Sequence, residues 1–321
     1  CSTTKRFIMK KFAYLSCLIM VSLIMAACQV VVSTPTLPAE VTEEQGLEAT
    51  LEVLLTQQAA TIESLTTSVA LTPSPIPTEE AVIPEVTVIP IYTGEFNVIE
   101  SGGLVFKLPV EVAANAEVTS VLPDDPNEGW PEFALPARRK IDFSGYVIQD
   151  HFHTPVVYVY PFEKMLQAGV YGGNTASNLL AILEYPSIDL QATENLPFLP
   201  PFNAAQVFHV MEKRLDSENG RGIRFLTLYS QGIVGVTNYE IFYTYQGLSA
   251  DGRYYFAAVL PINSSLLPDL QLSNDELDKI VNEYPDYIES MTETIRTQNG
   301  GILTPSLEAL DAMMMSLISV N

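Results

Sequence analysis

Two histidines separated by one residue are the clearest candidate for chemistry in this sequence. His151 and His153 form an H-x-H pattern directly after Asp150. Alternate residues of a strand point to the same side, so both imidazole rings could reach one divalent metal ion. A working site needs a third ligand, and His209 is the only other histidine in the chain. The pattern predicts either a metal site or two histidines at the edge of a strand.

Two other segments have compositions that suit ligand binding. Residues 124–128 gather oxygen atoms of the kind that bind Ca²⁺, or they form an acidic turn in solvent. Residues 196–202 hold two leucines, two phenylalanines and three prolines. If Phe198, Leu199 and Phe202 are exposed, they mark a binding site or a lid. If they fold down, they cover the edge of a sheet or the core.

Common catalytic motifs are missing from the sequence. No G-x-S-x-G, H-E-x-x-H, Walker A or G-x-G-x-x-G pattern occurs. The three histidines, and the lack of any cysteine after residue 28, leave few candidates for catalysis by His or Cys. A glycosidase that uses two carboxylates stays open, although no acidic pair stands out.

The charge is strongly acidic outside the first residues. The chain has 16 basic and 38 acidic residues, and residues 1–27 contain four of the basic residues and no acidic one. The remaining 12 basic and 38 acidic residues give the rest of the chain a net charge of −26. Nucleic acid and anionic lipid surfaces repel such a chain, so we expect neither as a partner.

The N-terminal residues have the order of an export signal. Met9-Lys10-Lys11 is a short basic region, and residues 12–25 form an apolar segment without charge. The segment is shorter than the roughly 20 residues that span a bilayer, and small residues follow it. This order is typical of a cleaved signal peptide.

The end of this segment carries a lipidation pattern. Leu23-Ile24-Met25-Ala26-Ala27-Cys28 resembles the lipobox of bacterial lipoproteins, although Met25 stands where that family usually has leucine. The resemblance implies that residues 1–27 are removed, and that Cys28 bears a covalent lipid that anchors the protein to the membrane. The domain would then face the extracytoplasmic side of the cell membrane or outer membrane. The alternative is an ordinary signal peptide, with Cys28 as an incidental thiol.

Residues 28–93 are predicted to form the lipid anchor and a stalk. They are rich in Thr, Pro, Glu and Val, and segments such as residues 72–77 favour extended chain. Within residues 48–70, a heptad pattern predicts a short coiled coil that would make the protein a homo-oligomer. The alternative is a frayed helix or a disordered linker, because several threonines interrupt the pattern. The seam residues are Leu51, Leu55, Gln58, Ile62, Leu65 and Val69.

Residues 94–321 change to a pattern of strands and turns, and no cysteine is available there for a disulfide. Asn219-Gly220 and Asp251-Gly252 are hairpin signals that predict an antiparallel meander. Strands are expected at residues 104–108, 118–122, 140–148, 156–161, 206–215, 223–229, 239–246 and 253–262, and a helix at residues 175–184.

Helices are expected to follow the meander. Residues 273–276 form a capping box, Pro285 should kink or split the next helix, and Thr304 should cap the last helix. That helix is expected to include Leu317 and Ile318. The sequence thus predicts an α+β domain, a meander covered by helices on one face. The order of the meander and the closing helix (residues 310–317) is similar to the PsbP/Mog1 group over about the last third of the chain, and this resemblance carries over no functional residue.

These features favour a tethered, non-catalytic domain that binds an extracytoplasmic protein, a peptide or a small ligand. Apart from the lipid on Cys28, no cofactor is implied. One alternative is a metal-dependent enzyme or metal-binding protein that uses His151 and His153. The other is an oligomeric structural protein of the cell envelope, held together by the seam in residues 48–70.

Overall fold

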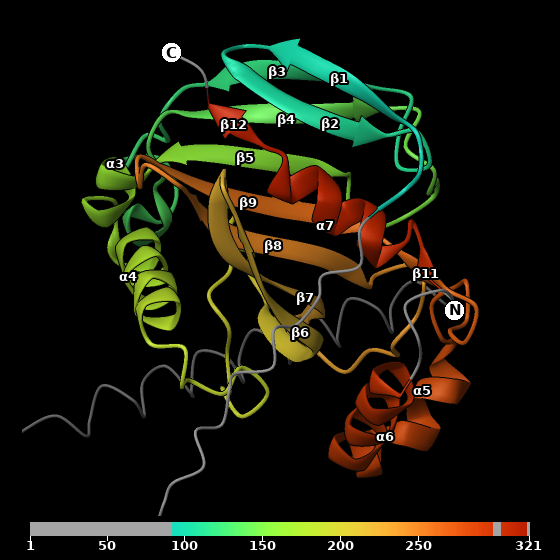
Figure 1. Ribbon diagram of the computed structural model, residues 1–321. Helices are drawn as coiled ribbons and strands as arrows, with labels where there is room; N and C mark the ends of the chain where they lie inside the picture. The colour runs from blue at the N-terminus through green and yellow to red at the C-terminus, as the bar shows by residue number, and fades with distance from the viewer. Residues whose placement is uncertain (1–91, 298–302, 320–321) are drawn as a thin grey trace, which may run out of the picture. The chain divides into compact units, whose positions relative to one another are not determined.

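The computed structural model describes residues 92–297 and 303–319 (Figure 1). The predicted signal segment, the lipidation site Cys28 and the seam in residues 48–70 lie outside the described residues. The described part is an α+β domain with a large antiparallel sheet and helices.

Within the described residues, seven antiparallel strands form the central sheet, which runs from β3 at the top of Figure 1 to β6 at the bottom. Between β5 and β6 the chain leaves the sheet, and this long connection later forms part of the site. In sheet order, the strands are β3 (Asn115–Val121), β4 (Arg138–Ser144), β5 (Val156–Pro161), β9 (Tyr254–Pro261), β8 (Phe242–Ser249), β7 (Gly220–Ser230) and β6 (Ala205–Ser217).

The predicted meander over residues 206–262 is confirmed, and several strand ends differ from the prediction. The hairpins β6–β7 and β8–β9 turn at the Asn-Gly and Asp-Gly signals. The predicted strand 140–148 is too long, because Gly145 turns the chain with a φ of +64° and β4 ends at Ser144. The predicted strand 239–246 starts too early, because Ile241 N–H donates to the Thr237 carbonyl in a turn before β8.

Short strands join the two ends of the domain. β1 (Phe96–Ser101), which was not predicted, pairs with β2 (Leu104–Pro109), and β2 also pairs with β12 (Ile318–Ser319). The assignment of Leu317 and Ile318 to the last helix was wrong, because α7 (Leu307–Met315) ends before Leu317 and Ile318 belongs to β12. A second small sheet pairs β10 (Asn263–Ser264) with β11 (Leu303–Thr304).

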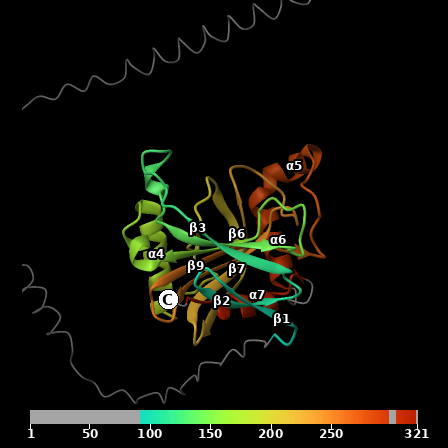
Figure 2. The same ribbon diagram turned by 90° about the horizontal axis from the view of Figure 1, so that it is seen from above.

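The helices flank the sheet, with α4 on one side of the domain and α5 and α6 on the other (Figures 1 and 2). The capping box at residues 273–276 and the split before Pro285 are confirmed. The last helix is capped by Ser306 rather than Thr304, because Thr304 pairs with Asn263 in β11. The helices are α3 (Phe162–Leu166), α4 (Val170–Glu184), α5 (Asn274–Ile280), α6 (Tyr284–Arg296) and α7 (Leu307–Met315), with 3-10 turns η1 (Pro131–Phe133) and η2 (Val281–Glu283). None of these described helices is long and apolar enough to cross a membrane.

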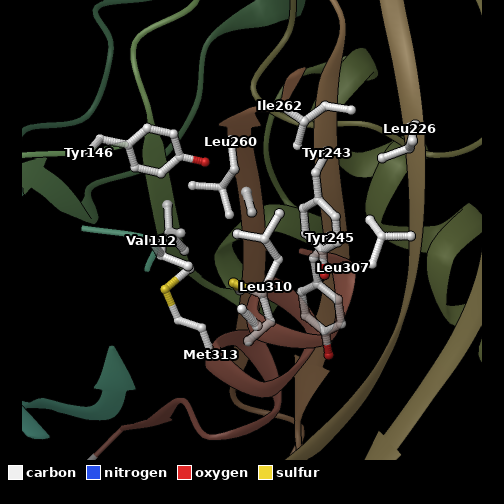
Figure 3. Close-up of a cluster of buried hydrophobic side chains, with 14 of the residues drawn as sticks. Val112, Tyr146, Leu226, Tyr243, Tyr245, Leu260, Ile262, Leu307, Leu310 and Met313 are labelled. Carbon is white, nitrogen blue, oxygen red and sulfur yellow. The ribbon is translucent and has the colours of Figure 1, made fainter. Parts of the chain in front are cut away.

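The expectation that helices cover one face of the sheet was wrong, because both faces are buried. On one face, Tyr243 and Tyr245 of β8 pack against Leu310 and Met313 of α7 (Figure 3). On the other face, α3, α4 and the 196–202 loop cover the sheet. Seven of the eight residues of β8 are buried as a result, including polar side chains that alternate with the tyrosines. Because apolar burial is the main stabilising term in folding, two packed faces fit a domain whose described residues contain no cysteine.

Candidate binding surface

The fold brings the two candidate segments of the sequence together. The ring of His153 stacks on Phe202 with centroids 5.1 Å apart and planes inclined by 6°. Two hollows of about 400 and 550 Å³ adjoin here, and both are lined by residues 201–203. We call the lining rings the aromatic surface, which consists of Trp130, Phe133, Phe152, His153, Phe202 and Tyr229.

The exposure of these rings makes the surface unusual. Trp130 is 73% exposed and Phe152 is 61% exposed, although solvent-exposed aromatic rings carry a cost in water. Trp130 lines the smaller hollow and Phe152 the larger one, with Phe202 shared between them. Clustered exposed apolar side chains of this kind mark interaction sites in soluble domains.

The position of Trp130 depends on a close approach between η1 and the start of α4. A Cβ atom on Gly169 would lie 2.7 Å from the carbonyl oxygens of Pro131 and Glu132, so only glycine permits this contact. Phe133 then packs on Tyr171 of α4 with a centroid distance of 5.3 Å. The start of α4 thereby supports Phe133, which lines the smaller hollow.

The H-x-H segment lies in the loop between β4 and β5, so its predicted place in a strand was wrong. His151 Nε2 donates to the Ile241 carbonyl at 2.9 Å, and His151 Nδ1 accepts from the His153 amide at 2.9 Å. The Phe152 amide donates to the Tyr239 carbonyl, also at 2.9 Å. These bonds hold the loop against residues 239–241 and leave the ring of Phe152 in solvent.

The hydrogen bonds of the histidines bear on the predicted metal site. Because both ring nitrogens of His151 have backbone partners, a metal ion would have to displace one of them. The third histidine, His209, contacts Glu212 and Thr193 instead. Among the residues that the structure describes, no group of three or more His, Cys, Asp or Glu side chains could hold a metal ion. A metal bound by His151 and His153 stays a prediction. Binding it would break one of the hydrogen bonds that His151 makes with the backbone.

Burial keeps both imidazoles neutral. Burial, followed by the neighbouring charge of His151, lowers the pKa of His153 to about 4. Burial also lowers the pKa of His151, and the hydrogen bond to the Ile241 carbonyl offsets part of this effect. At pH 7 both imidazoles are therefore uncharged, including that of His153, which lines the larger hollow.

The 196–202 loop folds down onto the sheet, as one of the two interpretations proposed. Phe198 is 2% exposed and Leu199 is fully buried, so neither is available to a ligand. Phe202 is half-buried and reaches the surface. Phe198 supports the surface from below, with centroid distances of 4.5 Å to Tyr229 and 5.0 Å to Phe202.

The loop is held down by the side chain of Gln246 in β8. This fully buried amide accepts from the Leu199 backbone N–H at 3.1 Å and donates to the Leu199 carbonyl at 3.0 Å. The Tyr255 hydroxyl also donates to the same amide oxygen at 2.8 Å. Buried backbone N–H and C=O groups need hydrogen-bond partners. The side chain of Gln246 supplies both partners for Leu199, as a neighbouring strand would in a sheet.

The acidic run 124–128 forms a turn in solvent. Asp125 Oδ1 accepts from the backbone and side chain of Asn127 at 2.8 and 2.9 Å, which is an Asx turn. Asp124 forms an ion pair with Arg138 at 3.0 Å. This agrees with the interpretation of an acidic turn, and the turn leads into Trp130.

Sequence reasoning missed Trp130, Phe133, Phe152 and Tyr229. A signal was present for one of them, because the only tryptophan of the chain lies between Gly129 and Pro131, where a turn favours exposure. The others sit in segments whose exposure depends on the packing of distant residues.

No protein-family model matches this chain, and a comparison with curated proteins also finds no match.

Replacing Gln246 with leucine should destabilise the domain by about 2–4 kcal/mol. The change leaves the buried amide and carbonyl of Leu199 without partners, and each unsatisfied group costs about 1–3 kcal/mol. Urea denaturation of Gln246→Leu and of the exposed control Gln167→Leu measures this difference. Equal stability of the two variants would contradict the assigned role of Gln246.

Acidification should reveal the neutral state of His153. Below the unfolded-state pKa of about 6.5, the unfolded chain takes up a proton that folded His153 does not take up until about pH 4. The free energy of unfolding should therefore fall between pH 6.5 and 4, by up to about 3 kcal/mol from this residue. His153→Phe removes that contribution, so the variant should lose less stability than the parent between pH 6.5 and 4. Urea titrations at several pH values measure the free energy of unfolding of both proteins. Parallel losses in both proteins would show that folding does not lower the pKa of His153.

Proposed function

We propose that this protein is a lipid-anchored binding protein outside the cytoplasm, and that its domain holds an extended peptide segment of a partner at the aromatic surface. The observation that carries the proposal is the pair of adjoining hollows between Trp130 and Phe152, with Phe202 shared by both. Aromatic-lined grooves of this kind bind extended, proline-containing segments in several recognition domains.

The chemistry of the lining supports a peptide as the ligand. Exposed rings offer flat faces for pyrrolidine rings, and the polyproline conformation is already ordered before binding. Asn203 and Gln231 line the larger hollow and can bond to the unpaired backbone groups of such a segment. Glu132 and Glu240 at the two hollows favour basic residues in the ligand.

The environment of His153 supports binding rather than catalysis. Its ring is stacked on Phe202 and lies 4.6 Å from the ring of Phe242 in an edge contact. Its pKa of about 4 keeps it neutral at pH 7, where a general base would need a value closer to the working pH. We assign it a packing role in the floor of the surface.

The proposed anchor completes this function. A lipid on Cys28 would hold the protein at the membrane, and the stalk in residues 28–93 would extend the domain from it. If the seam in residues 48–70 pairs, two or three aromatic surfaces would act together and raise the apparent affinity for a repetitive partner. We also propose that the meander and closing helix are similar to those of the PsbP/Mog1 group. This similarity specifies no ligand.

The single tryptophan gives a direct test of the aromatic surface. Titrating the full chain in detergent with proline-rich peptides should change the fluorescence of Trp130, more strongly for basic than for acidic peptides. Phe202→Ala should weaken binding about tenfold or more, as expected for a central aromatic contact. The control Phe96→Ala removes a ring that is 43% exposed and lies outside both hollows.

Two outcomes would contradict the peptide proposal. One is an unchanged fluorescence with every peptide. The other is a saturable change with oligosaccharides alone, which would assign the same rings to sugar binding.

The anchor is tested independently in cells. Cys28→Ser should move the protein from the membrane fraction to the soluble fraction, because no acyl chain can be attached to serine through a thioether. Mass spectrometry of the parent should find lipid on the mature N-terminus. The anchor is refuted if the serine variant stays as firmly bound to the membrane as the parent and the parent carries no lipid. The peptide site is tested separately by the fluorescence titration.

A further inference from the structure

A third hollow, of about 580 Å³, lies across the edge strand β6 and shares no lining residue with the aromatic surface among the described residues. Loop 188–191, residues 211–214 of β6, Arg224 of β7 and Arg296 of α6 form its walls. We call it the basic hollow. Its volume falls within the range of about 300–1,000 Å³ that is typical of small-molecule sites.

The basic hollow concentrates positive charge in an acidic domain. All 12 basic residues that follow Cys28 lie in the described ranges, and four of them line this one hollow. The described ranges also carry 29 acidic residues, of which Asp189 and Glu212 are in the lining. A scattered arrangement of charges would not produce this excess of cations, so the hollow should attract a negatively charged group.

Two of these cations form no ion pair within the described residues. The Lys213 side chain also makes no hydrogen bond in the ranges 92–297 and 303–319, and its charge offsets part of the rise that burial causes in the pKa of Asp311. The Arg214 guanidinium donates to the carbonyls of Ile182, Tyr185 and Ile188. Burial lowers the pKa of Arg214, and the charge of Asp216 offsets part of this effect. Arg224 and Arg296, in contrast, already face Asp311 and Glu293.

A bulge in β6 places a carboxylate in the same hollow. Val210 faces Leu226 and Lys213 faces Arg224, so Met211 and Glu212 together lie opposite one residue of β7. Met211 has a φ of +57°, which is unusual for a side chain other than glycine, and its carbonyl accepts from Arg224 Nη1. The extra residue shifts the alternation of the strand, so Glu212 points to the same face as His209.

Glu212 has one oxygen bound and one oxygen unpaired. Its Oε1 lies 2.5 Å from His209 Nδ1, and His209 Nε2 donates to the Thr193 carbonyl at 2.8 Å. Burial raises the pKa of Glu212, but the hydrogen bonds from His209 and the backbone outweigh burial, so the pKa lies below its usual value. The Glu212 side chain is 1% exposed, and its Oε2 has no hydrogen-bond partner in the described part of the chain. A buried, ionised oxygen of this kind requires a donor.

We infer that the basic hollow binds a small zwitterion, an α-amino acid. Its carboxylate is attracted by Lys213 and Arg214, and its ammonium group is attracted by Glu212 and Asp189. A dianion such as phosphate fits less well, because two carboxylates in the lining repel it. A diamine fits less well, because the cations repel it. This inference is independent of the peptide site.

Calorimetric titration of the full chain in detergent tests the inference. The probes are the twenty standard amino acids, with succinate, putrescine and inorganic phosphate as ligands that carry one sign of charge. At least one amino acid should bind, and Lys213→Gln should weaken its binding about tenfold. Lys164→Gln removes the same charge from an exposed position on α3 and should leave the affinity unchanged.

Glu212→Gln is a second variant, and it tests the contact to the ammonium group. The affinity for the amino acid should fall about tenfold, while the affinity for succinate should stay the same or increase. Circular dichroism and thermal unfolding establish that each variant is folded before it is titrated. The inference is overturned if no amino acid binds at millimolar concentration, if succinate or phosphate binds as tightly as the best amino acid, or if Lys164→Gln weakens binding as much as Lys213→Gln does.

Discussion

The hydrogen bonds between Gln246 and Leu199 are the interaction on which the aromatic surface depends. A buried loop has to satisfy its backbone N–H and C=O groups, and here one side-chain amide satisfies both groups of one residue. With the loop held on the sheet, Phe198 supports Phe202 and Tyr229 from below. The exposed rings are therefore mounted on a buried aromatic layer, which lowers the entropy that a ligand must remove on binding.

The same constraint explains why a polar strand lies inside the domain. Thr244 and Gln246 alternate with Tyr243 and Tyr245, a pattern that usually places the polar residues in water. The long connection between β5 and β6 instead covers that face with α4 and the 196–202 loop. The polar side chains keep hydrogen-bond partners there, since Thr244 donates to the Ala258 carbonyl at 2.6 Å.

The two proposed sites use different physical means to present groups to a ligand. The aromatic surface relies on rings that remain in solvent because neighbouring backbone contacts fix the loop of Phe152. The basic hollow relies on a bulge that changes which face of β6 carries Glu212, and Arg224 secures the bulge through the carbonyl of Met211. Bulges are known to redirect side chains near functional sites, which fits the position of Glu212.

The sequence by itself predicted the α+β class, the hairpin turns, the capping box and the split before Pro285, because each depends on residues that are close along the chain. It also supplied the expectation of a lipid anchor at Cys28. Only the tertiary structure decided that both faces of the sheet are covered, that His153 meets Phe202 and that His209 meets Glu212. Residues three apart in a regular strand point to opposite faces, so no local pattern could reveal the last contact. Packing between distant segments determines such contacts, and a pattern of neighbouring residues does not record them.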